Sequence, residues 1–110
     1  MSEFLESEIV QEELGDISKM LEKIYEKIFY YGSMSRDGKL ECIDMLTTLL
    51  DKQKIMYTRL SLSDDPKAIE MKENLRKSVV MMGFPPETDM QFLFNSMHAT
   101  IQSLRDYVDA

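Results

Sequence analysis

The stretch "VQEELGDISKMLEKIYEKIFYYG", residues 10–32, decides the fold. Its apolar residues recur at alternating spacings of four and three, which is the heptad pattern of a helix that packs along another helix. We name six of them the seam: Val10, Leu14, Ile17, Leu21, Ile24 and Ile28. Ser7 can cap this helix at its start, and Gly32 can end it with a left-handed residue.

The remainder of the chain repeats this pattern of apolar helical faces separated by turns. The turn "GSMSRDGK" at 32–39 has a glycine near each end, and Asp65 before Pro66 is typical of a helix start. Gly83 stops that helix, and the two prolines of "GFPPETD" cannot continue it. We therefore predict helices over about residues 7–31, 39–60, 66–82 and 87–108.

These elements predict an all-α fold, a small bundle of about four helices in one domain covering residues 1–110. The chain is 44% hydrophobic and 30% charged, which is ordinary for a protein with a packed core. The first helix would be about 37 Å long, more than the short helix at 66–82 can cover. We expect the uncovered seam to be buried against a second copy, so that the protein is a homo-oligomer, most simply a two-fold dimer.

The residues that could support catalysis are few. The chain has one cysteine, Cys42, and one histidine, His98. No acidic residue stands three or four positions before His98, so the Glu-x-x-His pairs of di-iron bundles are missing, and one Cys with one His is not a zinc cluster. We expect a buried Cys42 and a boundary His98, with no catalytic residue, metal or cofactor. A thiol or metal-dependent enzyme using both, with the N-terminal carboxylates, is the alternative.

Six acidic residues and no basic one occupy residues 2–16. They fit a solvated helix entry, a docking surface for a basic protein partner, or a cation site. Docking would use a row of acids on one helical face, and its candidates are Glu8, Glu12 and Asp16. A cation site is the weakest interpretation, because hard cations need convergent oxygens that one straight row does not supply.

Overall charge and composition narrow the classes of partner. The net charge is −7 and no Lys/Arg cluster is interleaved with aromatic residues, so we expect no nucleic-acid binding; an acidic decoy of nucleic acid remains an alternative. The longest apolar run is too short for a bilayer, so we expect no membrane span. An acidic start without an apolar run and a single cysteine predict a cytoplasmic protein. Ten methionines suit core filling or an adaptable partner groove.

Several segments resemble one family of small proteins of cyanobacteria and their viruses, domain-of-unknown-function family 1825. They are "FLESEIVQEEL" at 4–14, "YGSMSRDGK" at 31–39, "LLDKQKIMYTRLSLSDD" at 49–65 and "MGFPPETDMQFLFNSM" at 82–97. Departures from the family pattern at Met34 and Ser35, and near Leu14 and Gly15, favour a viral member. The resemblance implies a helical protein of unassigned role and carries over no catalytic residue.

From these patterns we interpret the protein as a non-enzymatic, homo-oligomeric helical protein that binds another macromolecule. A protein partner is expected, and modulation of host physiology during infection is the role that the resemblance suggests.

Overall fold

The computed structural model describes residues 3–110, and throughout that range the only regular elements are helices. In chain order they are α1 (Glu3–Glu6), α2 (Glu8–Ile28), the short 3₁₀ helix η1 (Tyr31–Ser33), α3 (Arg36–Leu62), α4 (Pro66–Met81) and α5 (Met90–Asp109). The predicted all-α fold is confirmed. None of these helices is long and apolar enough to cross a bilayer within the part of the chain described.

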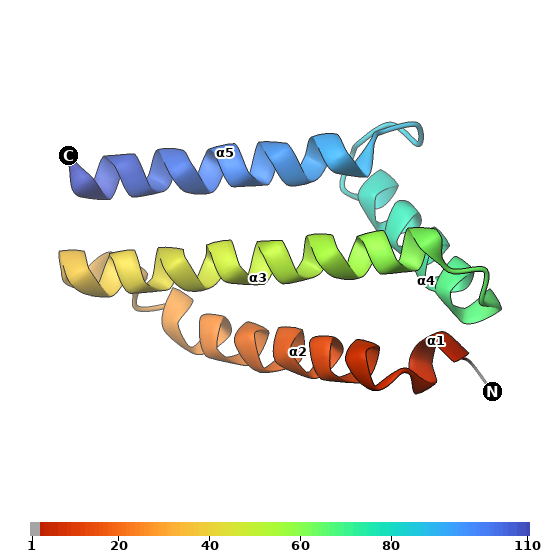
Figure 1. Cartoon of the computed structure of the whole chain (residues 1–110). Coiled ribbons are helices and arrows are strands. Elements are labelled where there is room, and N and C mark those ends of the chain that lie inside the picture. Colours follow the sequence, from red (N-terminus) through yellow and green to blue (C-terminus); the bar gives the residue numbers. More distant parts are fainter. Residues whose placement is uncertain (1–2) are drawn as a thin grey trace.

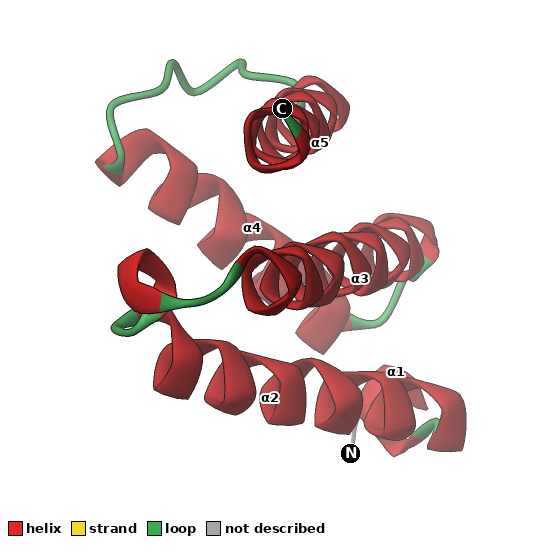
Figure 2. Ribbon diagram, turned by 90° about the vertical axis from the view of Figure 1, so that its left-hand side faces the viewer, coloured by secondary structure: helices red, strands yellow, loops and turns green. Residues whose placement is uncertain are grey.

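The long helix α3 forms the middle of the molecule. α2 and α5 run antiparallel to it on its two opposite sides, so α3 separates them (Figures 1 and 2). The shorter α4 crosses behind the end of this layer where α3 ends and α5 begins (Figure 1). The result is a flat molecule of 47 × 32 × 19 Å rather than a closed four-helix bundle.

Short polar side chains begin the long helices as local capping chemistry predicts. Ser7 accepts a hydrogen bond from the amide of Val10 at the start of α2, and Asp65 accepts one from the amide of Lys67 at the start of α4. Asp65 also accepts a 2.7 Å hydrogen bond from the Phe4 amide, 61 positions away in the chain. This one carboxylate therefore caps α4 and holds α1 beside it.

The end of α2 differs from the prediction. The helix ends at Ile28, and Gly32 lies inside η1 instead of providing a left-handed exit. Among the described residues, Gly83 alone has a positive φ, at 100°. The prediction for Gly32 is therefore wrong: the chain leaves α2 through right-handed and 3₁₀ turns, in which the amide of Tyr30 bonds to the carbonyl of Lys27.

Two helices begin at other residues than the sequence predicts, and the capping contacts explain both differences. α3 begins at Arg36 instead of residue 39, because Ser35 accepts a 3.1 Å hydrogen bond from the Gly38 amide and so acts as its cap. α5 begins at Met90 instead of residue 87, because Thr88 closes a turn on the carbonyl of Pro85 before Asp89 caps the helix.

The seam of α2 is covered by α3 of the same chain. Val10 and Ile24 are buried, Leu14, Ile17 and Leu21 are half-buried, and Ile28 at the far end is exposed. Val10 packs in a cluster with Phe4, Met56, Leu60 and Ala68. The argument that this seam needs a second copy was wrong, because α3 has 27 residues and is longer than the 21-residue α2. Oligomerisation itself stays a prediction.

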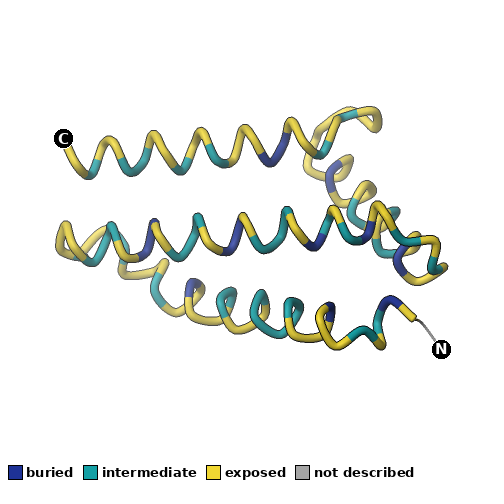
Figure 3. Tube along the Cα trace, viewed as in Figure 1, coloured by how far each residue is buried: buried dark blue, intermediate teal, exposed yellow. Residues whose placement is uncertain are grey.

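Burial is uneven across the layer. Buried positions recur along α3, whereas α5 is fully buried only at Leu93 and Phe94 near its start (Figure 3). The apolar residues in the later part of α5, Ile101, Leu104 and Val108, are only half-buried. One side of the α3–α5 pair is therefore incompletely covered.

Candidate binding groove

An apolar groove of about 690 Å³ lies between α3, α4 and α5 and reaches Ile17 of α2. Twenty residues line it: Ile17, Leu46, Leu49, Leu50, Gln53, Met56, Tyr57, Leu60, Leu75, Val79, Met82, Phe84, Met90, Phe92, Leu93, Phe94, Ser96, Met97, Thr100 and Ile101. None of these lining residues carries a charge. The volume and the predominantly apolar lining lie within the range of ligand-binding pockets in proteins.

The chain reversal after α4 shapes one end of the groove. Gly83 adopts the left-handed conformation, its amide bonds to the carbonyl of Val80, and the Phe84 amide bonds to the carbonyl of Val79. This pair of hydrogen bonds is the Schellman arrangement, which brings the residue after the glycine back over the last helical turn. Phe84 consequently lines the groove together with Val79. Gly83 therefore ends α4 as predicted and also places an aromatic ring at the site.

The rim of the groove is apolar and open to solvent. Met82, Phe92 and Met97 are 69, 62 and 44% exposed. Four of the ten methionines of the chain line the groove: Met56, Met82, Met90 and Met97. Unbranched thioether side chains adapt to partners of varied shape, so their position supports the partner-groove interpretation of the methionine excess, while Met56 also serves the core.

A second hollow of about 370 Å³ lies between α4, Tyr57 of α3 and the turn that leads into α5, and its lining includes charged residues. Its lining includes Lys72, Glu73, Arg76 and Asp89. Arg76 and Glu73 pair with each other, and the hydrogen bond from the Arg76 side chain lowers the pKa of Glu73. The charges in this hollow partly satisfy one another, so the apolar groove is the stronger candidate site.

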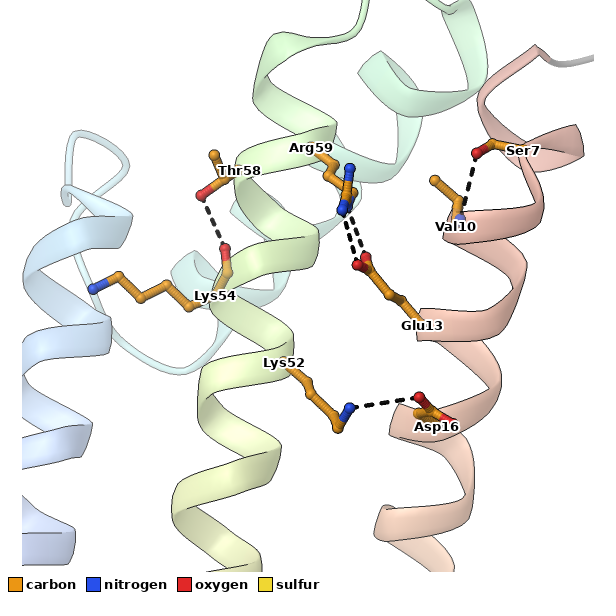
Figure 4. Close-up of polar contacts among 8 residues, drawn as sticks. All are labelled: Ser7, Val10, Glu13, Asp16, Lys52, Lys54, Thr58 and Arg59. Carbon is orange, nitrogen blue, oxygen red and sulfur yellow. Dashed lines mark hydrogen bonds and ion pairs between the residues drawn. The ribbon is translucent and has the colours of Figure 1, made fainter.

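The acidic N-terminal stretch divides into inward and outward residues. Arg59 donates hydrogen bonds from Nε and Nη2 to the two carboxylate oxygens of Glu13, at 2.8 and 3.0 Å (Figure 4). One turn further along α2, Asp16 pairs with Lys52 at 3.5 Å (Figure 4). Both pairs join α2 to α3. Part of the acid in this stretch therefore orients two helices.

The three predicted docking residues do not share one environment. Glu8 and Glu12 are exposed on α2, whereas Asp16 is half-buried and paired with Lys52. Sequence reasoning missed Glu13, although a signal was present. Glu13 directly precedes the seam residue Leu14, a flanking position from which heptad helices form ion pairs with a neighbour.

Cys42 and His98 lie apart. Cys42 is buried in α3, and His98 Nε2 lies 3.1 Å from Asp51 Oδ1. Asp51 follows Cys42 by nine positions (51 − 42), about 13 Å along the helix axis, so the histidine is too far along α3 to activate the thiol. Across residues 3–110, no group of three or more His, Cys, Asp or Glu side chains is placed to hold a metal ion.

Fold and groove together define a small all-α protein with an antiparallel three-helix layer, a crossing fourth helix and an open apolar groove. The family model described as "Domain of unknown function (DUF1825)" matches residues 2–108. The chain belongs to this family. No curated protein and no solved structure shows significant similarity to it.

Proposed function

We propose that this is a non-enzymatic, self-associating helical protein that acts by binding another protein in its apolar groove. The observation that carries the proposal is the groove itself: a hollow of about 690 Å³ with an uncharged lining and an exposed apolar rim. Monomeric proteins rarely leave a large apolar patch open to water unless the patch binds a partner. An amphipathic helix is the segment of protein best suited to a groove between helices.

The charges of the chain fit a second, weaker contact with a partner that carries basic groups. Glu8 and Glu12 are exposed on α2, away from the pairs that Glu13 and Asp16 form with α3. Basic groups on a partner would be attracted to them and would accelerate association. An acidic decoy of nucleic acid is less well supported, because the pairs with Arg59 and Lys52 interrupt the acidic row.

Site-specific photo-crosslinking tests this proposal. A photoreactive side chain at Met97, inside the groove, is compared with one at Ile55 of α3, which is 50% exposed and does not line the groove. Both proteins are exposed to a cyanobacterial lysate, matching the origin that the family resemblance suggests, and the products are identified by mass spectrometry. We expect a defined polypeptide adduct at position 97 and none at position 55. Equal labelling at both positions, or none, would contradict the proposal.

A further inference from the structure

The chain exposes more surface than a compact monomer of its size. Its accessible surface is 7679 Å², whereas a folded monomer of 12.9 kDa exposes about 6,300 Å² on average. The excess of about 1,400 Å² is larger than the roughly 800 Å² that one partner buries in a standard protein interface. The radius of gyration, 15.9 Å, also exceeds the roughly 13 Å of a compact domain of this length. The monomer therefore has an interface-sized surface to bury.

Part of this surplus surface lies where the groove opens. The molecule is only 19 Å thick, the later half of α5 has no fully buried residue, and the groove rim is apolar. Thirteen of the twenty residues that line the groove retain exposed surface, fewer than the 20 to 30 residues per side of a standard interface, so a partner in the groove would also contact the surface beside it. A partner of about this chain's own size is sufficient to cover it.

Shape favours a second copy of the same chain as that partner. Two copies of net charge −7 repel each other, and the uncharged lining of the groove keeps that repulsion low where they would meet. A two-fold interface needs a projection and a hollow on the same surface. The corner between α4 and α5 projects Met81, Met82 and Phe84, all exposed, immediately beside the hollow.

We propose that two copies of this chain dock groove to groove as a two-fold dimer. The α4–α5 corner of each copy enters the groove of the other near Leu49, Met97 and Ile101. A two-fold axis that is parallel to the layer and perpendicular to its long dimension gives this arrangement. It places the two copies face to face and reverses the ends of one relative to the other. The inference rests on the proposed function, since it names the first protein that occupies the groove.

The test compares the wild type with Met97→Glu and with Ile55→Glu by sedimentation equilibrium. Both positions carry an apolar, about half-exposed side chain on a helix, and only Met97 lines the groove. At about 50 μM, we expect the wild type and Ile55→Glu to sediment at twice the 12.9 kDa chain mass. Met97→Glu should dissociate at least about tenfold more readily, because its charge would be desolvated in the interface. Circular dichroism should show equal helicity in all three proteins.

If Met97→Glu loses helicity, the wild type still decides the matter. Methionine methyl groups in mixed samples of isotope-labelled and unlabelled chains should show intermolecular nuclear Overhauser effects at Met82 and Met97. A wild-type monomer at the same concentration, a dimer insensitive to Met97→Glu, or a bound small molecule in native mass spectra without dimerisation would each overturn the inference. In that event a crosslink from position 97 to a different protein would leave the proposed function standing, whereas the absence of any crosslink would remove both.

Discussion

Arg59 donates two hydrogen bonds to Glu13, from Nε and Nη2 to separate carboxylate oxygens, and this pair joins α3 to α2 near the start of the chain. The planar guanidinium matches a carboxylate in this geometry, and such pairs are stronger than single contacts between charged side chains. The Glu13 carboxylate is mostly shielded, with its side chain 23% exposed. Within the acidic stretch, Glu13 therefore stabilises the contact between two helices, and it does not belong to the exposed row formed by Glu8 and Glu12.

Glu13→Gln should lower the free energy of unfolding by about 1 kcal/mol, the upper end for a partly exposed ion pair. Urea denaturation followed by circular dichroism measures the change. Glu12→Gln is the matched control on the adjacent, exposed residue and should change stability by less than about 0.5 kcal/mol. A double-mutant cycle with Arg59→Gln should assign most of the loss to the pair. Equal effects of Glu12→Gln and Glu13→Gln would show that the contact contributes nothing.

Two residues of the seam distinguish packing within one chain from packing between chains. Ile24 is 5% exposed beneath α3 and Ile28 is 51% exposed. Ile24→Asp should cost about 4 kcal/mol or more, because it places an unpaired charge in the core and removes apolar packing. Ile28→Asp should cost about 1 kcal/mol at most, including its unfavourable position near the helix C-terminus. Thermal unfolding of both variants provides the comparison.

The opposite result would be informative. A well-folded Ile24→Asp protein that differs from the wild type only in molecular mass would mean that the seam joins two copies, as its heptad pattern alone suggested.

The helical parts of this fold are predictable because their causes are local. Asp65 before Pro66 specifies a helix start through one side chain and one missing amide, and the structure contains that cap. Gly83 stops α4 for an equally local reason. The prediction for Gly32 is wrong because α2 already ends at Ile28, four residues before the glycine.

The groove and the ion pairs could not be predicted from the sequence, because both form where helices that are far apart in the sequence come together. Periodicity shows that Met90 and Met97 share a face of α5, but it does not show that α4 leaves this face partly open. Which helix covers the seam is a similar case. A seam on residues 10–28 fits a second copy or a long internal neighbour equally well, and within one chain the long α3 is such a neighbour.

Cys42 offers a direct test of the enzyme alternative. Its thiol is buried in α3, so a thiol reagent should label the native protein far more slowly than the urea-unfolded chain. The double substitution Cys42→Ala with His98→Gln should leave groove crosslinking from position 97 unchanged, and should cost about 1 kcal/mol of stability for the lost sulfur. Rapid native labelling, or loss of a measured activity at unchanged helicity, would favour catalysis.

Neutralising the predicted docking residues Glu8, Glu12 and Asp16 should affect stability differently at different positions. Glu8→Gln with Glu12→Gln should leave the melting temperature nearly unchanged, because relief of repulsion at spacing four offsets the lost attraction to the helix N-terminus. Asp16→Asn should lower it slightly, because Lys52 loses its partner. The triple variant should therefore melt slightly below the wild type, whereas the i+4 spacing of the three acids, taken alone, predicts equal or higher stability.

Association with a basic partner, distinct from a second copy of this chain, should respond in the reverse order. Glu8 and Glu12 are the exposed members of the row, so the double Gln variant should slow association with a basic partner and flatten its dependence on salt, while dissociation changes little. Screening over about 10 Å at 0.1 M salt makes the wild-type rate fall as salt rises. Asp16→Asn is the matched control, because its carboxylate is already engaged by Lys52, and it should associate at nearly the wild-type rate. Stopped-flow association from about 20 to 500 mM salt measures all three slopes. Parallel slopes for the wild type and the double Gln variant would return Glu8 and Glu12 to the role of a solvated helix entry, with the groove alone accounting for binding.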